Sequence, residues 1–426
     1  MVRMSGRPAN WAGNVVYQAD RVHRPRSLEE LQELVSRSGK VRALGTGHSF
    51  NRIADSAGVL VSTAGLPPVI DISPDRATVT VSSGIRYGEL AQRLHAEGLA
   101  LHNLASLPHI STAGACATAT HGSGDANGNL ATAVAAIETV TADGEVTVLR
   151  RDASGDHFRA AVAGLGAFGI VTRMSVDIMP TFDVRQDVFE DLPSEQLKAH
   201  FEEIFSSAYS VSVFTTWLGS RHSMVWLKRR IGEHDSWRPE PRWMGARLAD
   251  RPRHPIPSEP AGYATQQLGV PGPWHERLPH FRLDFTPSSG EEIQTEYLLP
   301  RHLAPDALDA MAGLGERMAP VLQISEIRTV AADDLWMSPS YQRDTVALHF
   351  TWIKDTAAVL PVIAAMEDRL APLAARPHWG KLFTMPPPAV SALYERSSDF
   401  AALLSRADPA GKFRNDFIDH YFPLVP

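Results

Sequence analysis

The stretch from residue 99 to residue 124, LALHNLASLPHISTAGACATATHGSG, contains no Asp, Glu, Lys or Arg and is crowded with Gly, Ala, Ser and Thr. An ordinary hydrophobic core has more large apolar side chains than this stretch supplies. Small residues at this density let a backbone lie close to a flat ligand, and the hydroxyl groups offer hydrogen-bond donors without bulk. The composition therefore favours a ligand-binding segment over the alternative, a tightly packed loop of small residues in a core.

A second unusual segment, Arg42–Asn51, reads RALGTGHSFN. A short apolar run stops at Gly45-Thr46-Gly47, and His48 follows at once. Two glycines around a threonine make a turn whose backbone N–H groups can converge on a phosphate. His48 beside that turn could act as a ligand, a base or a nucleophile. The alternative is a polar turn after an edge strand, and the spacing alone does not separate the two interpretations.

Short strands and helices alternate through the first 180 residues. Ser27 and Glu30 form a capping box for a helix that ends near Gly39. Asp143-Gly144 is typical of a hairpin turn. Further predictions are strands at residues 10–17, 41–44, 59–62, 69–72, 78–81, 136–141, 145–149 and 170–178, and helices at 87–96 and around 157–162.

The segment Gly164–Gly169 matches the pattern GxGxxG of dinucleotide-binding folds. That motif needs a strand before it and a helix after it. Here a helix precedes the glycines, and the alternation of Met174, Val176 and Ile178 with polar residues predicts a strand after them. A nicotinamide dehydrogenase is therefore disfavoured, although the glycines still allow a ligand to come close.

Beyond Met179-Pro180 the chain is richer in Trp and Phe and holds charged residues inside apolar runs. In a strand, Glu326 and Arg328 point to the same face. With His349 and Lys381 from neighbouring runs they could orient a polyhydroxylated substrate, or they could be separate surface residues. Strands are expected at 211–217, 223–228 and 281–285, and helices at 307–318 and 356–370.

Composition excludes several functions. The net charge is -7 and no dense basic run occurs, so nucleic acid is not expected as a partner. The N-terminus lacks the apolar core of a signal peptide, and no apolar segment is long enough to span a membrane. The single cysteine, Cys116, fits a reducing cytoplasm. No paired Cys/His spacing predicts a metal. We expect a cytoplasmic protein without a membrane partner.

Taken together, these segments resemble the FAD-dependent oxidases of the vanillyl-alcohol oxidase superfamily, and most of all its alditol oxidase (xylitol oxidase) group. The resemblance extends over almost the whole chain. The motifs that carry it are NWAGN at 10–14, GTGHSFN at 45–51, ASLPHIS at 105–111, ATHGSG at 119–124, VPGPWHERLPHF at 270–281, SEIRTVAAD at 325–333, HFTW at 349–352, PHWGK at 377–381 and DPAGKF at 408–413.

The resemblance implies an α+β fold with two domains. Residues 1–180 would form the FAD-binding domain and residues 181–380 a substrate domain that caps the flavin. Residues 381–426 would return to the FAD-binding domain. A monomer is expected.

The resemblance also implies that His48 is bonded covalently to the flavin 8α-methyl group. Cys116 lies beyond the region where some relatives make a second bond, so one bond is expected. The other residues expected to hold FAD are Leu44, Gly45, Thr46, Gly47, Ser49, Ala105, Ser106, Ser111, Gly114, Thr118, Ala119, Thr120, His121, Ile170 and Val171.

The implied reaction is hydride transfer from the terminal C1 of an alditol, such as xylitol or sorbitol, to flavin N5. An aldose is formed, and dioxygen is reduced to hydrogen peroxide. Ala105 would leave space for dioxygen beside the flavin. Substrate binding and catalysis are expected from Ser106, Glu326, Arg328, His349, Thr351 and Lys381, with His349 and Lys381 as candidates for the base.

Two other functions stay open. One is a sugar-lactone oxidase or dehydrogenase with the same fold, and the other is a flavin-binding sensor without turnover. Charged residues under a cap argue against the sensor.

Overall fold

The strands of the first 180 residues form small sheets. The structure is a computed structural model, and it describes residues 7–232, 237–285 and 291–424. A parallel sheet has the order β1 (Val22–His23), β3 (Val59–Val61), β2 (Val41–Ala43). An antiparallel sheet has the order β4 (Ile70–Ile72), β5 (Thr78–Ser82), β9 (Ile170–Asp177), β7 (Val134–Val140), β8 (Val146–Arg150). β6 (Leu99–Ala100) pairs with β10 (Met179–Pro180).

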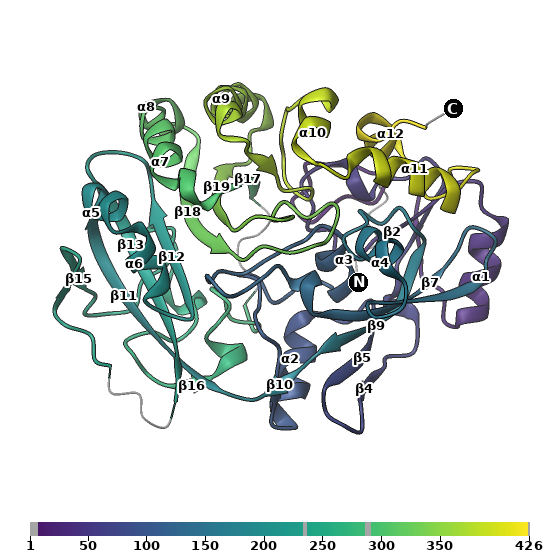
Figure 1. Cartoon of the computed structure of the whole chain (residues 1–426), viewed down its shortest axis with the longest axis horizontal. Coiled ribbons are helices and arrows are strands. Elements are labelled where there is room, and N and C mark those ends of the chain that lie inside the picture. The colour runs from purple at the N-terminus through teal and green to yellow at the C-terminus, as the bar shows by residue number, and fades with distance from the viewer. Residues whose placement is uncertain (1–6, 233–236, 286–290, 425–426) are drawn as a thin grey trace.

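Helices of this half pack on these sheets, as the right side of Figure 1 shows. In α1 (Leu28–Arg37) the Ser27 side chain accepts a hydrogen bond from the Glu30 N–H, which confirms the predicted cap. Leu31 and Val35 of this helix are buried against the two sheets. The other helices are α2 (Tyr87–Ala96), α3 (Thr112–Ala117) and α4 (Gly155–Val162). α4 precedes Gly164–Gly169 and β9 follows, so the predicted element order around these glycines is confirmed.

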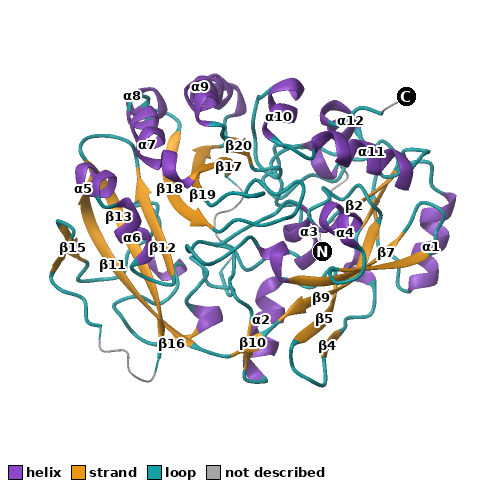
Figure 2. Cartoon of the chain, in the orientation of Figure 1, coloured by secondary structure: helices purple, strands orange, loops and turns teal. Residues whose placement is uncertain are grey.

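The second half is built on a ten-stranded sheet, seen at the left and centre of Figure 2. Its central strands are β12 (Ser210–Thr215), β18 (Leu322–Val330), β19 (Thr345–Ile353) and β17 (Glu292–Pro300), in that order. The outer strands are β14 (Arg242–Trp243), β15 (Ala246–Leu248), β11 (Asp183–Pro193), β13 (Arg221–Ile231), β16 (Gly272–Pro273) and β20 (Arg376–Pro377).

One face of this sheet is covered by helices, and the other faces the N-terminal half (Figure 1). The helices are α5 (Ser194–Ala199), α6 (Phe201–Ser206), α7 (Ala304–Ala312), α8 (Gly315–Met318) and α9 (Thr356–Leu370). Their apolar residues and the alternate residues of the strands, such as Ile327, Leu348 and Phe350, form one core. The polar residues between them are thereby directed to the opposite face.

The last residues return to the N-terminal half, where yellow helices lie beside purple strands in Figure 1. These helices are α10 (Pro387–Leu393), α11 (Ser397–Ala407) and α12 (Asp416–Tyr421). The Val41 N–H donates to the Lys412 carbonyl at 2.9 Å, so the C-terminal segment extends the edge of β2. The short 3₁₀ helices are η1 (Arg52–Ala54), η2 (Thr63–Gly65), η3 (Leu130–Ala133), η4 (Ala261–Tyr263), η5 (Trp274–Glu276), η6 (Arg301–Leu303) and η7 (Ala371–Leu373).

Arg42 joins three of these segments. Its guanidinium group is 2% exposed and donates to the carbonyls of Gly166 at 2.9 Å, Leu165 at 2.7 Å and Phe413 at 2.8 Å, and also to that of Ile53. Burial lowers the pKa of Arg42 to about 10, so the group stays charged at neutral pH. One cation therefore holds together the loop after α4, the segment after the glycine turn and the C-terminal return.

Three predicted elements are wrong. Residues 10–17 form turns with one isolated bridge, because the Asn10 side chain accepts from the Val15 N–H and Gly13 has φ +70°. Residues 281–285 have an isolated bridge at Phe281 and then turn. The helix expected at 307–318 is divided into α7 and α8 around Gly313.

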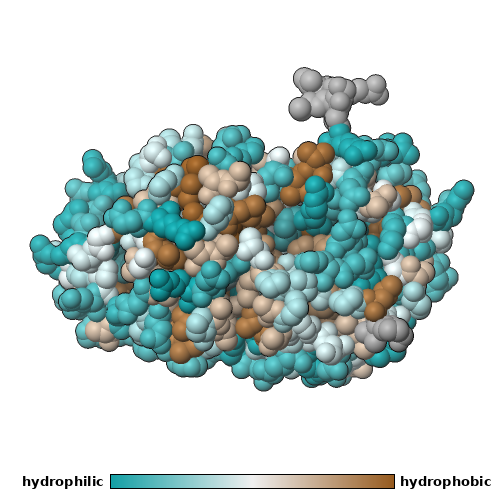
Figure 3. Space-filling view, turned by 90° about the horizontal axis from the view of Figure 1, so that it is seen from above, coloured by the Kyte–Doolittle hydropathy of each residue, from teal (hydrophilic) through white to brown (hydrophobic). Residues whose placement is uncertain are grey.

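The outer surface is mostly hydrophilic on the face seen in Figure 3, with hydrophobic residues in small separate patches. Among the described residues, no helix combines the length and the apolar character that crossing a membrane requires.

Replacing Arg42 tests its role in joining the segments. Arg42→Met should lower the free energy of unfolding by about 3 kcal/mol, because charge-assisted hydrogen bonds are lost and buried carbonyls are left unpaired. The measurement is the thermal midpoint. The control is Arg151→Met, since Arg151 makes an exposed ion pair with Asp177 and should contribute at most about 1 kcal/mol. Equal midpoints for the two variants would contradict this role.

Candidate active site

The glycine turn that contains His48 is held by the N-terminal segment. The Trp11 N–H donates to the Gly47 carbonyl at 2.8 Å, and the Asn10 amide donates to the Ser49 carbonyl at 2.9 Å. Gly47 has φ +73°, a conformation that side chains rarely adopt. A Cβ at Gly45 would lie 2.3 Å from Ser111 Oγ, so only glycine allows the turn to lie this close to α3. The glycines thus bring His48 and the stretch 99–124 together.

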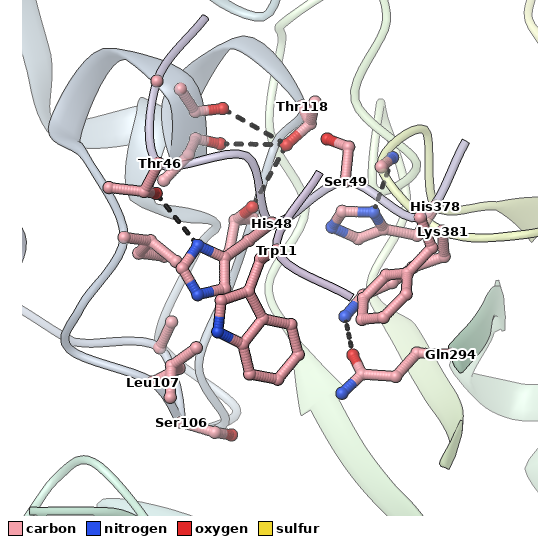
Figure 4. Close-up of a pocket in the computed structure, with 18 of the residues that line it drawn as sticks. Trp11, Thr46, His48, Ser49, Ser106, Leu107, Thr118, Gln294, His378 and Lys381 are labelled. Carbon is pink, nitrogen blue, oxygen red and sulfur yellow. Dashed lines mark hydrogen bonds between the residues drawn. The ribbon is translucent and has the colours of Figure 1, made fainter. Parts of the chain in front are cut away.

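The His48 ring lies between Thr46 and Trp11, as Figure 4 shows. Nδ1 is 3.0 Å from Thr46 Oγ1, and the ring stacks on Trp11 with centroids 5.0 Å apart. Burial, and to a smaller extent the positive charge of Lys381, lower the pKa of His48 to about 4. The imidazole is therefore neutral at physiological pH, which is the form that acts as a nucleophile.

Small residues of α3 and the loop after it continue the cavity that begins at this turn. The Ser111 N–H donates to Thr46 Oγ1 at 3.3 Å, and Thr118 Oγ1 lies 3.2 Å from Thr120 Oγ1. Gly114 also faces Ser111 so closely that a Cβ there would lie 2.8 Å from its Oγ. A cavity wall made largely of small residues with hydroxyl groups fits a flat, extended cofactor such as FAD.

A row of charged residues lies at the other end of the same cavity. On adjacent strands, Glu296 of β17 and Glu326 of β18 are both in register with His349 of β19. All three residues are at most 9% exposed. Gln294 and Thr351 form the neighbouring pair in the same ladder. Cross-strand register therefore assembles one polar face from three strands.

Glu296 is the central anion of this row. It accepts a hydrogen bond from Arg328 Nη2 and has His121 Nε2 at 3.3 Å and His349 Nδ1 at 3.4 Å. Burial acts to raise the pKa of the Glu296 carboxyl, but Arg328 together with the two histidines outweighs it, so the pKa lies well below its usual range. Glu296 is thus a carboxylate that neutralises Arg328.

The other cations face the same space. Arg328 Nη1 donates to Ser106 Oγ at 3.3 Å, and its Nε has no hydrogen-bond partner among the described residues. Lys381 donates to the Gln294 amide oxygen (Figure 4) and lies over the Phe50 ring at 5.1 Å. Burial lowers the pKa of Lys381 to about 8, although Glu296 opposes this shift. Unpaired N–H groups of this kind suit a ligand that brings hydrogen-bond acceptors.

The structure brings together most of the predicted site residues. All six predicted catalytic residues line the cavity. Of those expected to hold the cofactor, Ala119 and Ile170 are buried beside the lining rather than in it, and Ile170 packs in the core with α1. The predicted cofactor residues that line the cavity are Leu44, Gly45, Thr46, Gly47, His48, Ser49, Ala105, Ser106, Ser111, Gly114, Thr118, Thr120, His121 and Val171.

Several lining residues were not singled out from the sequence. Glu292, Gln294 and Glu296 alternate with buried residues along β17, and this period of two is a signal that could have found them. Trp11 and His280 belong to recognised motifs but had no assigned role. The outer wall is formed by His254, Pro255, Ile256, Glu259 and Tyr263, a loop without a detectable pattern. No group of His, Cys, Asp and Glu that could hold a metal occurs in the described ranges.

Known proteins share both halves of this arrangement. A family model described as an FAD binding domain matches residues 19–150, and one described as D-arabinono-1,4-lactone oxidase matches residues 289–421. An alditol oxidase from Streptomyces sp. is 52% identical over 97% of this chain and 99% of the relative. An L-gulono-1,4-lactone dehydrogenase from Mycobacterium tuberculosis is 29% identical over 96% of this chain and 97% of the relative.

Solved structures show the same fold. Cholesterol oxidase from Brevibacterium sterolicum superposes with a TM-score of 0.77 at 14% identity, and the match covers 97% of this chain and 96% of that one. At this identity the likeness concerns the fold alone. The expected α+β fold of the vanillyl-alcohol oxidase type is confirmed.

Removing the charge of Glu296 should destabilise the row. Glu296→Gln leaves the buried Arg328 without its main counterion and should lower the free energy of unfolding by about 3 kcal/mol. The control is Glu202→Gln, because Glu202 is 70% exposed in its pair with Arg301 and its loss should cost at most about 1 kcal/mol. The measurement is the thermal midpoint of both variants. An unchanged midpoint for Glu296→Gln would show that the buried Arg328 does not need this carboxylate as its counterion.

Proposed function

The chain belongs to the alditol oxidase family, and on that premise we propose that it oxidises the terminal C1 hydroxyl of an alditol such as xylitol or sorbitol to the aldose. The observation that carries this proposal is the 52% identity to an alditol oxidase over nearly the full length of both chains. The protein is an FAD-dependent oxidase, and its second substrate is dioxygen, which is reduced to hydrogen peroxide.

The two ends of the cavity would have different roles, one in binding the cofactor and the other in binding the substrate. Residues 1–180, with the return segment 381–426, would bind FAD, and residues 181–380 would supply the substrate face. The contacts of Arg42 and Val41 with the C-terminal segment support this division. Ala119 and Ile170 would contribute through their backbone, since their side chains are turned away from the cavity lining. A monomer in the cytoplasm stays a prediction.

His48 is the residue that would attach the flavin covalently. Its ring is neutral at physiological pH, is fixed by Thr46 and Trp11, and lines the cavity. A neutral imidazole nitrogen is the nucleophile that a bond to the 8α-methyl group requires. Cys116 is buried against Tyr87, so it would make no second bond.

A polyol carries no charge, so hydrogen bonds must select it, and those made with charged groups are the strongest. Glu326 would accept from substrate hydroxyls, while Arg328 and Lys381 would donate to them. Ser106 and Thr351 are neutral partners on the two sides of the same space. This arrangement would hold the terminal carbon in one orientation beside the cofactor.

When bound, FAD would supply the redox chemistry, as the acceptor of a hydride from the substrate carbon and the donor of electrons to dioxygen. The protein must take the hydroxyl proton. His349 is kept neutral by burial, which lowers its pKa against the opposing charge of Glu296, and Lys381 has a pKa of about 8. A neutral His349 can accept the proton directly, whereas Lys381 can accept it only in its uncharged form. Ala105 would leave dioxygen room to enter.

Product analysis with alternative substrates tests the proposed function. The purified protein should consume dioxygen and release one equivalent of hydrogen peroxide for each xylitol or sorbitol oxidised. A sugar lactone such as L-gulono-1,4-lactone should give a kcat/KM lower by roughly two orders of magnitude, because differences in a few hydrogen bonds are worth about 3 kcal/mol. Peroxide formed from the lactone and not from xylitol would make the protein a lactone oxidase instead, and absence of any turnover would favour a sensor.

The covalent bond is tested by acid precipitation. The wild-type pellet should remain yellow, because the flavin stays attached to the denatured chain. His48→Ala should give a colourless pellet and a yellow supernatant. Thr46→Val is a useful comparison, since it removes only the hydroxyl that orients the ring and should lower the attached fraction without abolishing it. A colourless wild-type pellet would exclude the bond.

A further inference from the structure

Lys228 is a buried cation behind the substrate face. It lies on β13, is 1% exposed, and is in register with Gln186 of β11 and Ser210 of β12. Its ammonium group reaches the carbonyls of Leu278 at 2.6 Å and Pro279 at 2.8 Å, and His280 Nδ1 at 3.2 Å. An ammonium has three N–H donors, so these three acceptors satisfy it completely. A lysine buried at such cost of desolvation needs a reason, and its third contact points to the site.

His280 connects this lysine to the substrate face. Its Nε2 lies 2.7 Å from Glu326 Oε1, so both ring nitrogens are engaged. Because an ammonium has no lone pair, a charged Lys228 requires His280 Nδ1 to accept, and the ring proton must then be on Nε2. The backbone N–H of His280 also donates to the Ser106 carbonyl at 3.0 Å. One residue thus positions two groups that face the substrate.

We propose that Lys228 is a positioning residue for the oxidation of the polyol, which acts through His280 to hold Glu326 as an oriented hydrogen-bond acceptor. This inference rests on the proposed function. The N–H of His280 occupies one oxygen of Glu326, and the remaining lone pairs are then available to substrate hydroxyls. If the proton moves from Lys228 to His280, the pair still carries one positive charge, and Nε2–H still faces Glu326. The arrangement is therefore insensitive to where that proton resides.

The ionisation of Glu326 depends on every group that faces it. Burial acts to raise the pKa of Glu326, but Arg328 and His280 hold it far below its usual range. The charged and titratable groups that face Glu326 are Arg328 on the same strand, His349 on β19, His280, Lys228 and Lys381. Burial lowers the pKa of Lys228 well below its usual range, and Glu326 opposes this shift. In acid, where Lys228 carries its charge, its removal takes away one of the cations, so the pKa of Glu326 should rise.

The experiment compares Lys228→Met with the wild-type holoenzyme at matched FAD content. The KM for xylitol should rise roughly tenfold, the effect of weakening one charge-assisted hydrogen bond, while kcat changes much less. The acid limb of kcat/KM should move to higher pH, because Glu326 becomes easier to protonate. The matched control is Lys412→Met. Lys412 is also a buried lysine, and it donates to the carbonyls of Val35 and Ser36 in the last turn of α1. Its loss should leave KM and the pH profile unchanged.

A double variant shows whether Lys228 acts through Glu326. In a Glu326→Gln background, Lys228→Met should add little to the rise in KM, because the group that it positions is already altered. Additive effects of the two substitutions would overturn the inference. A wild-type KM and acid limb in Lys228→Met would also overturn it.

Two further readouts keep the outcome decisive. If Lys228→Met does not accumulate with bound flavin, His280→Gln is measured in its place, since it keeps an N–H near Glu326 but loses the ring that links Glu326 to Lys228. It should raise the KM in the same direction, and an unchanged KM and pH profile would overturn the proposal. Absence of xylitol oxidation by the wild-type protein would instead refute the proposed function.

Discussion

The charged side chain of Arg42 determines how the two ends of this chain meet. Its guanidinium group lies among backbone carbonyls from the turn region, the loop after α4 and the C-terminal return. Carbonyl groups buried away from water need donors, and one arginine can satisfy several of them at once. The glycine turn beside Arg42 then carries His48 against α3, and the return segment brings Lys381 to the same cavity. The strand that leads to the His48 turn and the C-terminal return are thus joined by one buried cation that has no role in the proposed chemistry.

The substrate face depends on a different constraint, the register of three strands. Glu296, His349 and Glu326 occupy one row because β17, β19 and β18 are paired without offset at these positions. The opposite faces of these strands carry core residues such as Ile327, Leu348 and Phe350, so a slip by one residue would place carboxylates in the core. The charged row is therefore fixed by the same packing that stabilises the domain. His280, in the loop after η5, and Lys228 of β13 then add a second layer behind it.

Local patterns in the sequence explain most of the fold and part of the site. Capping at Ser27, the hairpin at Asp143-Gly144 and the strand after Gly169 were predicted because each rests on a short-range signal. Glu326 and Arg328 were found in the same way, by alternation in one strand. Glu296 was not, because its importance comes from pairing with β19, which is a long-range contact. Residues 281–285 alternate like a strand, but within the described ranges their only pairing is the isolated bridge of Phe281 with Ala264. A local pattern cannot show whether a partner strand exists.

The outer wall of the cavity is a loop around residues 254–263. This loop is separate from the paired strands that hold the charged row. Segments that carry no ladder hydrogen bonds tolerate substitution and changes of length with little effect on the framework. Selection can therefore reshape the entrance for longer, shorter or cyclic sugars while the redox machinery behind it stays constant. An alditol oxidase and an L-gulono-1,4-lactone dehydrogenase align with this chain over nearly their full length, so enzymes named for different sugar substrates share one scaffold.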